Sequence, residues 1–279
     1  MAISAADVKS LRDKTGAGMM DCKKALNDAE GDFAKAEKVL KEMGLAAAAK
    51  REGRATNEGS IFTYVSDSAA GILEVATETD FVARNDTFKN MGKDLVKSMV
   101  ESNLSVESKE VTDVTAQAVS TIKENITAKR FVKMDIASNE VVFDYIHGEG
   151  SIGVLIKLTV DAPEKTADPA VKELGFSLAL HAAAFKPLYR VEADVDKEYL
   201  AEQEGIYRKQ AENMGKPEKV MQGIVAGKMK KHLSEICFVN QGFVKEDKKS
   251  VTQIIKEVGT QVGTDIELTD YVVFSVGQD

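Results

Sequence analysis

The sequence contains few of the residues that build disulfide frameworks and metal sites. Its 279 residues include only two cysteines and three histidines. Cys22 and Cys237 lie far apart and form no C-x-x-C unit, which is typical of free thiols in a reducing compartment. The histidines stand in separate segments, and none is followed three or four residues later by a second histidine or a cysteine. A metal site is therefore not expected.

Long apolar runs and an excess of positive charge are also missing. No stretch of 18 or more apolar residues occurs, so no membrane span is expected. The N-terminal letters, MAISAADVKS, match neither a secretory signal nor an organelle transit peptide. The formal net charge of −8 repels nucleic-acid phosphates. These observations predict a cytoplasmic protein that contacts neither membranes nor nucleic acid directly.

The signatures of nucleotide-binding enzymes are absent as well. The letters TGAGMM follow a predicted helix rather than a strand, and they lack the third glycine of a dinucleotide-binding fingerprint. No phosphate-binding G-x-x-x-x-G-K-[ST] loop occurs. The acids around Asp80 have no partner acid, base or metal ligand at a recognisable spacing. An enzyme is therefore the weakest interpretation, and no cofactor is expected.

The pattern that is present begins with helical periodicity in residues 1–44, where three short helices are expected. Ser4 and Asp7 resemble a capping box at the first helix. Asp32 can cap the third helix, and Gly44 is expected to end it. The charged, glycine-punctuated segment 46–59 predicts a linker whose start can be helical.

Beyond the linker the apolar residues alternate, which predicts a strand hairpin over residues 61–75 followed by a helix. A second helical stretch is expected at about 112–129, before a strand that starts at Arg130. Two strands recur at 141–160, and a helix follows at 169–185. This repeated order of elements predicts two related α+β subdomains.

Two charged helical stretches on either side of Pro217 predict an antiparallel helical hairpin at about residues 194–235. The expected α+β fold has three parts. They are a three-helix domain with its linker (1–54), a first core subdomain (55–140), and a second core subdomain that carries the hairpin (141–279).

Two segments stand out from this scheme, and the first is the glycine-rich corner before Met19 and Met20. These methionines are either core residues of a small helical domain or an adaptable apolar surface that another chain approaches over the glycines. Because consecutive residues cannot both face one small core, at least one methionine is expected to be exposed.

The second segment, TETDFVARND, places Phe81 behind a cluster of acids at the end of an apolar strand. Thr79 or Asp80 is expected to cap a short helix that has Phe81 and Val82 in its first turn. Phe81 is then either a lid on its own subdomain or a side chain presented to a partner at a strand-to-helix junction. Periodicity leaves both interpretations open.

The letters LRDKTGAGMMDCKKAL and TDFVARND resemble the two signatures of the bacterial translation elongation factor Ts family. The letters HGEGSIGVL and LHAAAFKP resemble its second core subdomain, and the match extends in order over nearly the whole chain. Members of this family are guanine-nucleotide exchange factors for elongation factor Tu. The resemblance implies a three-helix domain of the ubiquitin-associated type, two duplicated α+β core subdomains and an inserted antiparallel helical hairpin.

The resemblance also implies the roles of individual residues. It implies that the segment from Thr79 through Asp80, Phe81 and Val82 pushes into the GTPase domain of elongation factor Tu. Phe81 would enter an apolar gap between two partner helices. This intrusion would disturb the Mg²⁺ ion that helps to hold GDP.

Further contacts follow from the same resemblance. It implies that Met19, Met20 and Lys23 dock on the same GTPase domain, and that His147 helps the second subdomain to grip another domain of the partner. The resemblance also suggests that two copies of the chain associate through the hairpin. The polar faces of the hairpin argue against such a homodimer.

A second class of function is an adaptor whose ubiquitin-associated-type helices bind a peptide or a ubiquitin-like partner. This alternative accounts for residues 1–44 but leaves the duplicated core without a role. It predicts that residues 1–44 retain function alone, whereas an exchange factor needs the core.

Overall fold

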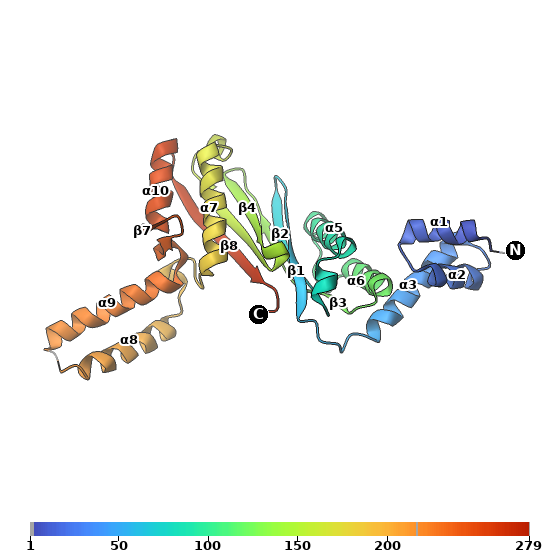
Figure 1. Cartoon of the computed structure of the whole chain (residues 1–279). Coiled ribbons are helices and arrows are strands. Elements are labelled where there is room, and N and C mark those ends of the chain that lie inside the picture. The colour runs from blue at the N-terminus through green and yellow to red at the C-terminus, as the bar shows by residue number, and fades with distance from the viewer. Residues whose placement is uncertain (1–2, 216, 279) are drawn as a thin grey trace. The chain divides into compact units, whose positions relative to one another are not determined.

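The computed structural model of the chain describes residues 3–215 and 217–278, which form an α+β structure with small antiparallel sheets (Figure 1). The expected fold class is confirmed. The chain divides into two compact units. One unit comprises Met1–Asp135, Ile146–Gly153 and Phe274–Asp279, and the other comprises Ile136–Tyr145 and Val154–Val273. The domain boundaries expected at residues 54 and 140 stay predictions.

The first unit begins with three helices, α1 (Ala5–Thr15), α2 (Met19–Asp28) and α3 (Phe33–Ala49). They enclose a small apolar core of their own. Its buried members are Val8, Leu11, Ala17, Cys22, Ala25, Leu26, Ala29, Ala36 and Leu40.

Both predicted helix caps form. Ser4 Oγ accepts a hydrogen bond from the Asp7 backbone N–H (3.1 Å), and the Asp7 carboxylate accepts one from the Ser4 N–H (2.9 Å). The Asp32 carboxylate accepts a hydrogen bond from the Lys35 N–H (3.0 Å). These bonds satisfy backbone donors that have no partner within their helices.

The expected end of the third helix at Gly44 is wrong, because α3 continues to Ala49. A Cβ atom at position 44 would lie 3.2 Å from the backbone oxygen of Ala116 in α6 (Lys109–Ile122). Gly44 therefore permits close packing of the two helices instead of ending one. The alanines that follow it favour helix.

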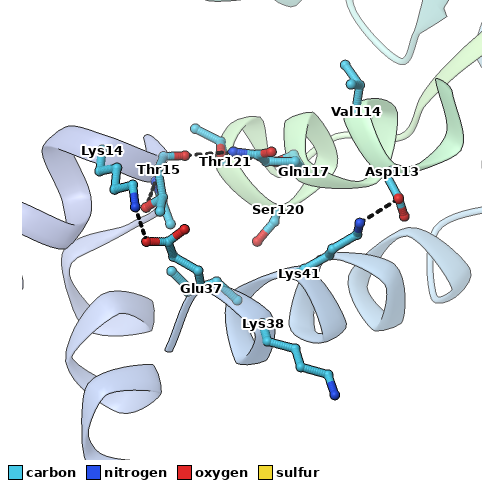
Figure 2. A pocket seen from close by; sticks show the side chains of 12 residues that line it. Lys14, Thr15, Glu37, Lys38, Lys41, Asp113, Val114, Gln117, Ser120 and Thr121 are labelled. Carbon is cyan, nitrogen blue, oxygen red and sulfur yellow. Dashed lines mark hydrogen bonds and ion pairs between the residues drawn. The ribbon is translucent and has the colours of Figure 1, made fainter. Parts of the chain in front are cut away.

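Polar side chains also hold this helical domain against α6, around a pocket of about 440 Å³ (Figure 2). Lys41 Nζ lies 2.6 Å from Asp113 Oδ2, and this ammonium group lowers the pKa of the Asp113 carboxyl. Gln117 Nε2 donates a hydrogen bond to the Thr15 carbonyl oxygen (2.8 Å). The three-helix domain is thus fixed to α6 by side chains as well as by the linker.

The first sheet has the order β1 (Glu58–Val65), β2 (Ala69–Thr77), β3 (Ile126–Asp135), and both pairings are antiparallel. α5 (Asp86–Ser102) and α6 pack on it. Their shared core contains Phe62, Leu73, Val75, Phe88, Leu95, Val96, Met99, Val111, Ala118, Val119 and Ile126.

The helix expected over residues 112–129 is wrong at its end. It stops at Ile122, and the segment from Ile126 onward belongs to β3. Lys123 has a left-handed backbone conformation (φ 72°), which ends α6. The loop formed by Lys123, Glu124 and Asn125 lies where the sequence pattern predicts continued helix.

The second sheet repeats this plan. Its order is β4 (Glu140–His147), β5 (Ile152–Val160), β8 (Ile266–Ser275), so β5 is central as β2 is in the first sheet. α7 (Pro169–Phe185) and α10 (Val251–Val262) pack against each other. The shared order of two strands, two helices and a third strand agrees with duplication.

Between α7 and α10 the chain forms the expected hairpin of α8 (Lys197–Glu212) and α9 (Glu218–Ile236), which pack against each other (Figure 1). Lys216, in its connection, lies outside the described residues. A small sheet of β6 (Gly242–Phe243) and β7 (Glu246–Ser250) is not predicted, because its charged letters show no apolar alternation.

The remaining elements are short. They are α4 (Asp80–Ala83) and the 3-10 turns η1 (Gly148–Gly150), η2 (Pro163–Lys165), η3 (Glu192–Asp194) and η4 (Phe238–Asn240). Across the described ranges, no helix is both long enough and apolar enough to cross a bilayer.

His181 links α7 to the small sheet inside the second unit. Its Nδ1 accepts a hydrogen bond from the Val244 backbone N–H (3.1 Å), and its Nε2 lies 2.9 Å from Gln241 Oε1. The ring is fully buried and stacks on Phe185 and Phe238. Because Nδ1 accepts a hydrogen bond, the ring is neutral, and burial lowers the pKa of His181.

This geometry predicts a pH-dependent stability. Unfolded histidine has a pKa of about 6.5, so below that pH the unfolded chain binds a proton that the folded His181 resists. The free energy of unfolding should fall as pH drops below about 6.5, by up to about 1.4 kcal/mol per pH unit from this group. Urea titrations of the parent and of His181→Gln measure it. The variant should show the shallower slope, and equal slopes would contradict the assignment.

Candidate partner-binding site

The segment that carries Phe81 is a single helical turn at the end of β2. α4 comprises only Asp80–Ala83, and Thr79 caps it by accepting a hydrogen bond from the Val82 backbone N–H (3.4 Å). Val82 packs against the core of the first sheet, and Ala83 is buried. The turn is therefore anchored by its inward side.

Phe81 points the other way. The residue is 83% exposed, the highest value among the large apolar residues that the structure describes. A ring that acts as a lid would be buried against its own subdomain. The interpretation of Phe81 as a lid is therefore wrong. An aromatic ring held in water is the arrangement expected of a side chain that another molecule buries.

Arg84 connects this turn to a distant part of the sequence. Its guanidinium lies 3.4 Å from Asp80 Oδ2 and 3.8 Å from Glu149 Oε2. Glu149 belongs to η1, which directly follows His147 at the end of β4, and His147 is exposed. The structure thus brings the turn after His147 beside the turn that carries Phe81, which the sequence pattern does not reveal.

The glycine-rich corner presents a second apolar surface. Met19 is 48% exposed and Met20 is 72% exposed, while Cys22, further along α2, is buried. Lys23 is exposed beside them. Both methionines are exposed, whereas the sequence argument requires only one of them to be exposed. The interpretation of this pair as core residues is therefore wrong.

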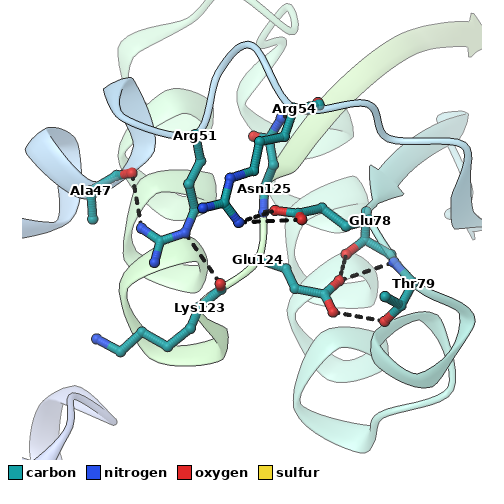
Figure 3. A network of polar contacts seen from close by, with 9 residues as sticks. Ala47, Arg51, Arg54, Glu78, Thr79, Lys123, Glu124 and Asn125 are labelled. Atoms are coloured by element: carbon teal, nitrogen blue, oxygen red, sulfur yellow. Dashed lines mark hydrogen bonds and ion pairs between the residues drawn. The ribbon is translucent and has the colours of Figure 1, made fainter.

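A polar network holds the base of the Phe81 turn (Figure 3). The Glu124 carboxylate accepts three hydrogen bonds. Thr77 Oγ1 (3.0 Å) and the Thr79 backbone N–H (3.0 Å) donate to Oε2, and Thr79 Oγ1 (2.7 Å) donates to Oε1. Since Glu124 follows the end of α6, this helix and the Phe81 turn are directly connected.

The same loop reaches the glycine-rich corner. Lys123 Nζ lies 3.1 Å from Asp21 Oδ2, in the first turn of α2 beside the two methionines. The Lys123 carbonyl oxygen accepts a hydrogen bond from Arg51 Nε in the linker (3.2 Å). Both apolar surfaces therefore attach to one short loop. Sequence reasoning misses this loop because the pattern assigns it to helix.

The charged groups around Phe81 are arranged as ion pairs and hydrogen bonds. The described part of the chain contains no group of three or more His, Cys, Asp or Glu side chains that could hold a metal ion. The acids near Phe81 form ion pairs or accept hydrogen bonds at the turn. An apolar tip flanked by charge suits insertion into a partner.

Comparisons with known proteins find matches along most of the chain. The family model described as Elongation factor TS matches residues 78–278. A protein of Borrelia hermsii named Elongation factor Ts is 50% identical over 279 residues, covering 99% of this chain and 100% of the relative. Proteins of the same name from Treponema denticola (44%) and Borreliella burgdorferi (46%) each align over 99% of both chains.

The exposure of Phe81 predicts that this side chain contributes little to the stability of the free protein. Phe81→Ala should change the free energy of unfolding by less than about 0.5 kcal/mol, as is usual for surface positions. Leu73→Ala, at a fully buried position of β2, should lower it by about 2–5 kcal/mol. Chemical denaturation of the two variants makes the comparison. A loss of more than about 2 kcal/mol in Phe81→Ala would return this ring to the core.

Proposed function

The chain belongs to the elongation factor Ts family, and we propose that it is the guanine-nucleotide exchange factor for elongation factor Tu. It binds the GDP complex of that partner and promotes the release of GDP during translation elongation. The observation that carries the proposal is the exposed Phe81 on a turn that is anchored from below. We also place the protein in the cytoplasm, where translation occurs.

The mechanism needs no covalent step. Thr79 caps the turn, Asp80 and Val82 flank its tip, and Phe81 enters the GTPase domain of the partner beside the nucleotide. The insertion disturbs the Mg²⁺ ion that the partner uses to hold the phosphates. The chain itself uses no cofactor.

The required energy is within reach of these groups. A thousandfold faster release requires a barrier that is lower by about 4 kcal/mol. Full burial of a Phe side chain contributes about 1.5–3 kcal/mol. A weakened metal site supplies the remainder.

Thermodynamic linkage fixes the direction of the effect. If this protein weakens GDP binding by some factor, GDP weakens the binding of this protein by the same factor. The protein therefore accelerates exchange in whichever direction nucleotide concentrations dictate. It does not by itself favour GTP.

Two further contacts complete the proposed interface. Met19, Met20 and Lys23 dock on the same GTPase domain, and His147 with the loop after it contacts another domain of the partner. Self-association through the α8–α9 hairpin stays a separate prediction.

Phe81→Ala is expected to bind elongation factor Tu but to lose most of the acceleration. Removing a buried ring that contributes about 1.5–3 kcal/mol should lower the maximal rate of GDP release by about 10–150-fold. Stopped-flow release of a fluorescent GDP measures this rate at increasing concentrations of factor.

Met214→Ala is the matched control, because Met214 is a half-exposed apolar residue in the α8–α9 hairpin. It should release GDP at the parental rate. If a folded Phe81→Ala variant is as fast as the parent, insertion of Phe81 is not the mechanism. If the parent has no effect on release, the proposed function fails.

A further inference from the structure

The turn that carries Phe81 is too short to maintain its own conformation. α4 has four residues, and isolated helices of this length do not form in water. Phe81 adds little burial to the free protein, since the residue is 83% exposed. The order of this turn therefore depends on contacts outside it.

Glu124 supplies the polar part of those contacts. A carboxylate can only accept hydrogen bonds, and both oxygens of Glu124 do so from the segment immediately before α4. Hydrogen bonds to a charged acceptor are about twice as strong as neutral ones. Two of the three bonds fix the backbone and the hydroxyl of Thr79, the N-cap residue of the turn, and the third holds Thr77.

The hydroxyl of Thr79 transmits this constraint into the turn. It donates its proton to Glu124 Oε1 (2.7 Å), so its lone pairs are left to accept from the Val82 backbone N–H (3.4 Å). Such chained hydrogen bonds strengthen one another. Glu124 thus sets the orientation of the cap that begins the helical turn containing Phe81.

A second carboxylate connects the same two loops, with donor and acceptor on the opposite loops (Figure 3). Glu78, which precedes Thr79, accepts a hydrogen bond at Oε1 from the Asn125 backbone N–H (2.7 Å). Each loop therefore offers a carboxylate to a backbone N–H of the other, as the two residues of a capping box do within one helix. The reciprocity fixes the two loops together rather than merely placing them nearby.

The position of Glu124 is itself well defined. Lys123 before it has a left-handed backbone, and Asn125 after it is 5% exposed and donates through Nδ2 to the Arg54 carbonyl oxygen (3.0 Å). Arg54 also pairs with Glu78 (3.3 Å). The loop that carries Glu124 is thus held by two other segments of the first unit, the linker at Arg54 and the segment before α4 at Glu78.

We propose that Glu124 is a positioning residue for nucleotide exchange, which acts by holding the Thr79 cap so that Phe81 is presented in its inserting conformation. The proposal rests on the proposed function. A turn that is ordered beforehand does not lose conformational entropy when Phe81 inserts. Without Glu124 the turn has to order during insertion, and GDP release slows.

Glu124→Gln tests the proposal, because glutamine keeps the size of the side chain but replaces one acceptor oxygen by a donor. Stopped-flow GDP release, measured against factor concentration, should show a maximal rate about tenfold below that of the parent. Glu202→Gln, an exposed carboxylate on α8, is the matched control and should keep the parental rate.

A double-mutant cycle separates positioning from a merely structural role. If Glu124 acts through Phe81, Glu124→Gln should slow release by less than about twofold in a Phe81→Ala background. The same tenfold loss in both backgrounds would overturn the proposal. So would a parental rate in the Glu124→Gln single variant.

Hydrogen exchange on the free protein gives an independent readout. In Glu124→Gln the amides of Val82, Ala83 and Arg84 should exchange about tenfold faster, while the amide of Leu73 in β2 stays protected. Unchanged protection of the turn would overturn the proposal. If the parent itself fails to accelerate GDP release, the proposed function fails, and hydrogen exchange still shows whether Glu124 orders the turn.

Discussion

Phe81 is held in water by the turn that carries it, although burial of an aromatic ring is favourable. The turn prevents collapse because its other side is occupied. Val82 and Ala83 contact the core of the first sheet, and Glu124 holds the cap at Thr79. The ring therefore cannot rotate inward without losing these contacts. The rest of the proposed interface depends on this arrangement, in which the inner side of the turn is fixed and Phe81 is exposed.

The α6–β3 loop gives the two apolar surfaces a common support. Lys123 pairs with Asp21 beside Met19 and Met20, and Glu124 holds the Phe81 turn. The ion pair of Lys123 is about half-exposed, so it contributes little energy by itself. Close packing of α3 on α6, which Gly44 permits, also attaches the three-helix domain. The polar contacts then define how the domain is oriented on α6.

Much of the fold can be predicted from the sequence because its elements have strong local signals. The capping box at Ser4, the strand alternation in β5 and the helix from Pro169 to Phe185 all appear as the pattern indicates. The errors fall where tertiary contacts override local preference. Gly44 looks like a helix end but faces a neighbouring helix, and the end of α6 at Lys123 depends on a left-handed residue that is not glycine.

The candidate site, too, can be predicted from the sequence only in part. Motif letters locate Phe81 and the methionines, yet periodicity alone does not show which way these side chains point, because a short turn has no repeating face. Arg84 with Glu149, and Glu124 with Thr79, are pairs that are distant in sequence and meet only in the folded chain. Such pairs leave no mark in the local pattern.

The central claim is that Phe81 is exposed in the free protein and buried in the partner. A fluorinated phenylalanine at position 81 alone, observed by ¹⁹F NMR, tests it most directly. In the free protein the resonance should show the full shift between H₂O and D₂O that a solvated ring shows. With nucleotide-free elongation factor Tu, the resonance should move and lose that solvent shift. A resonance that stays solvent-sensitive in the complex would contradict the account.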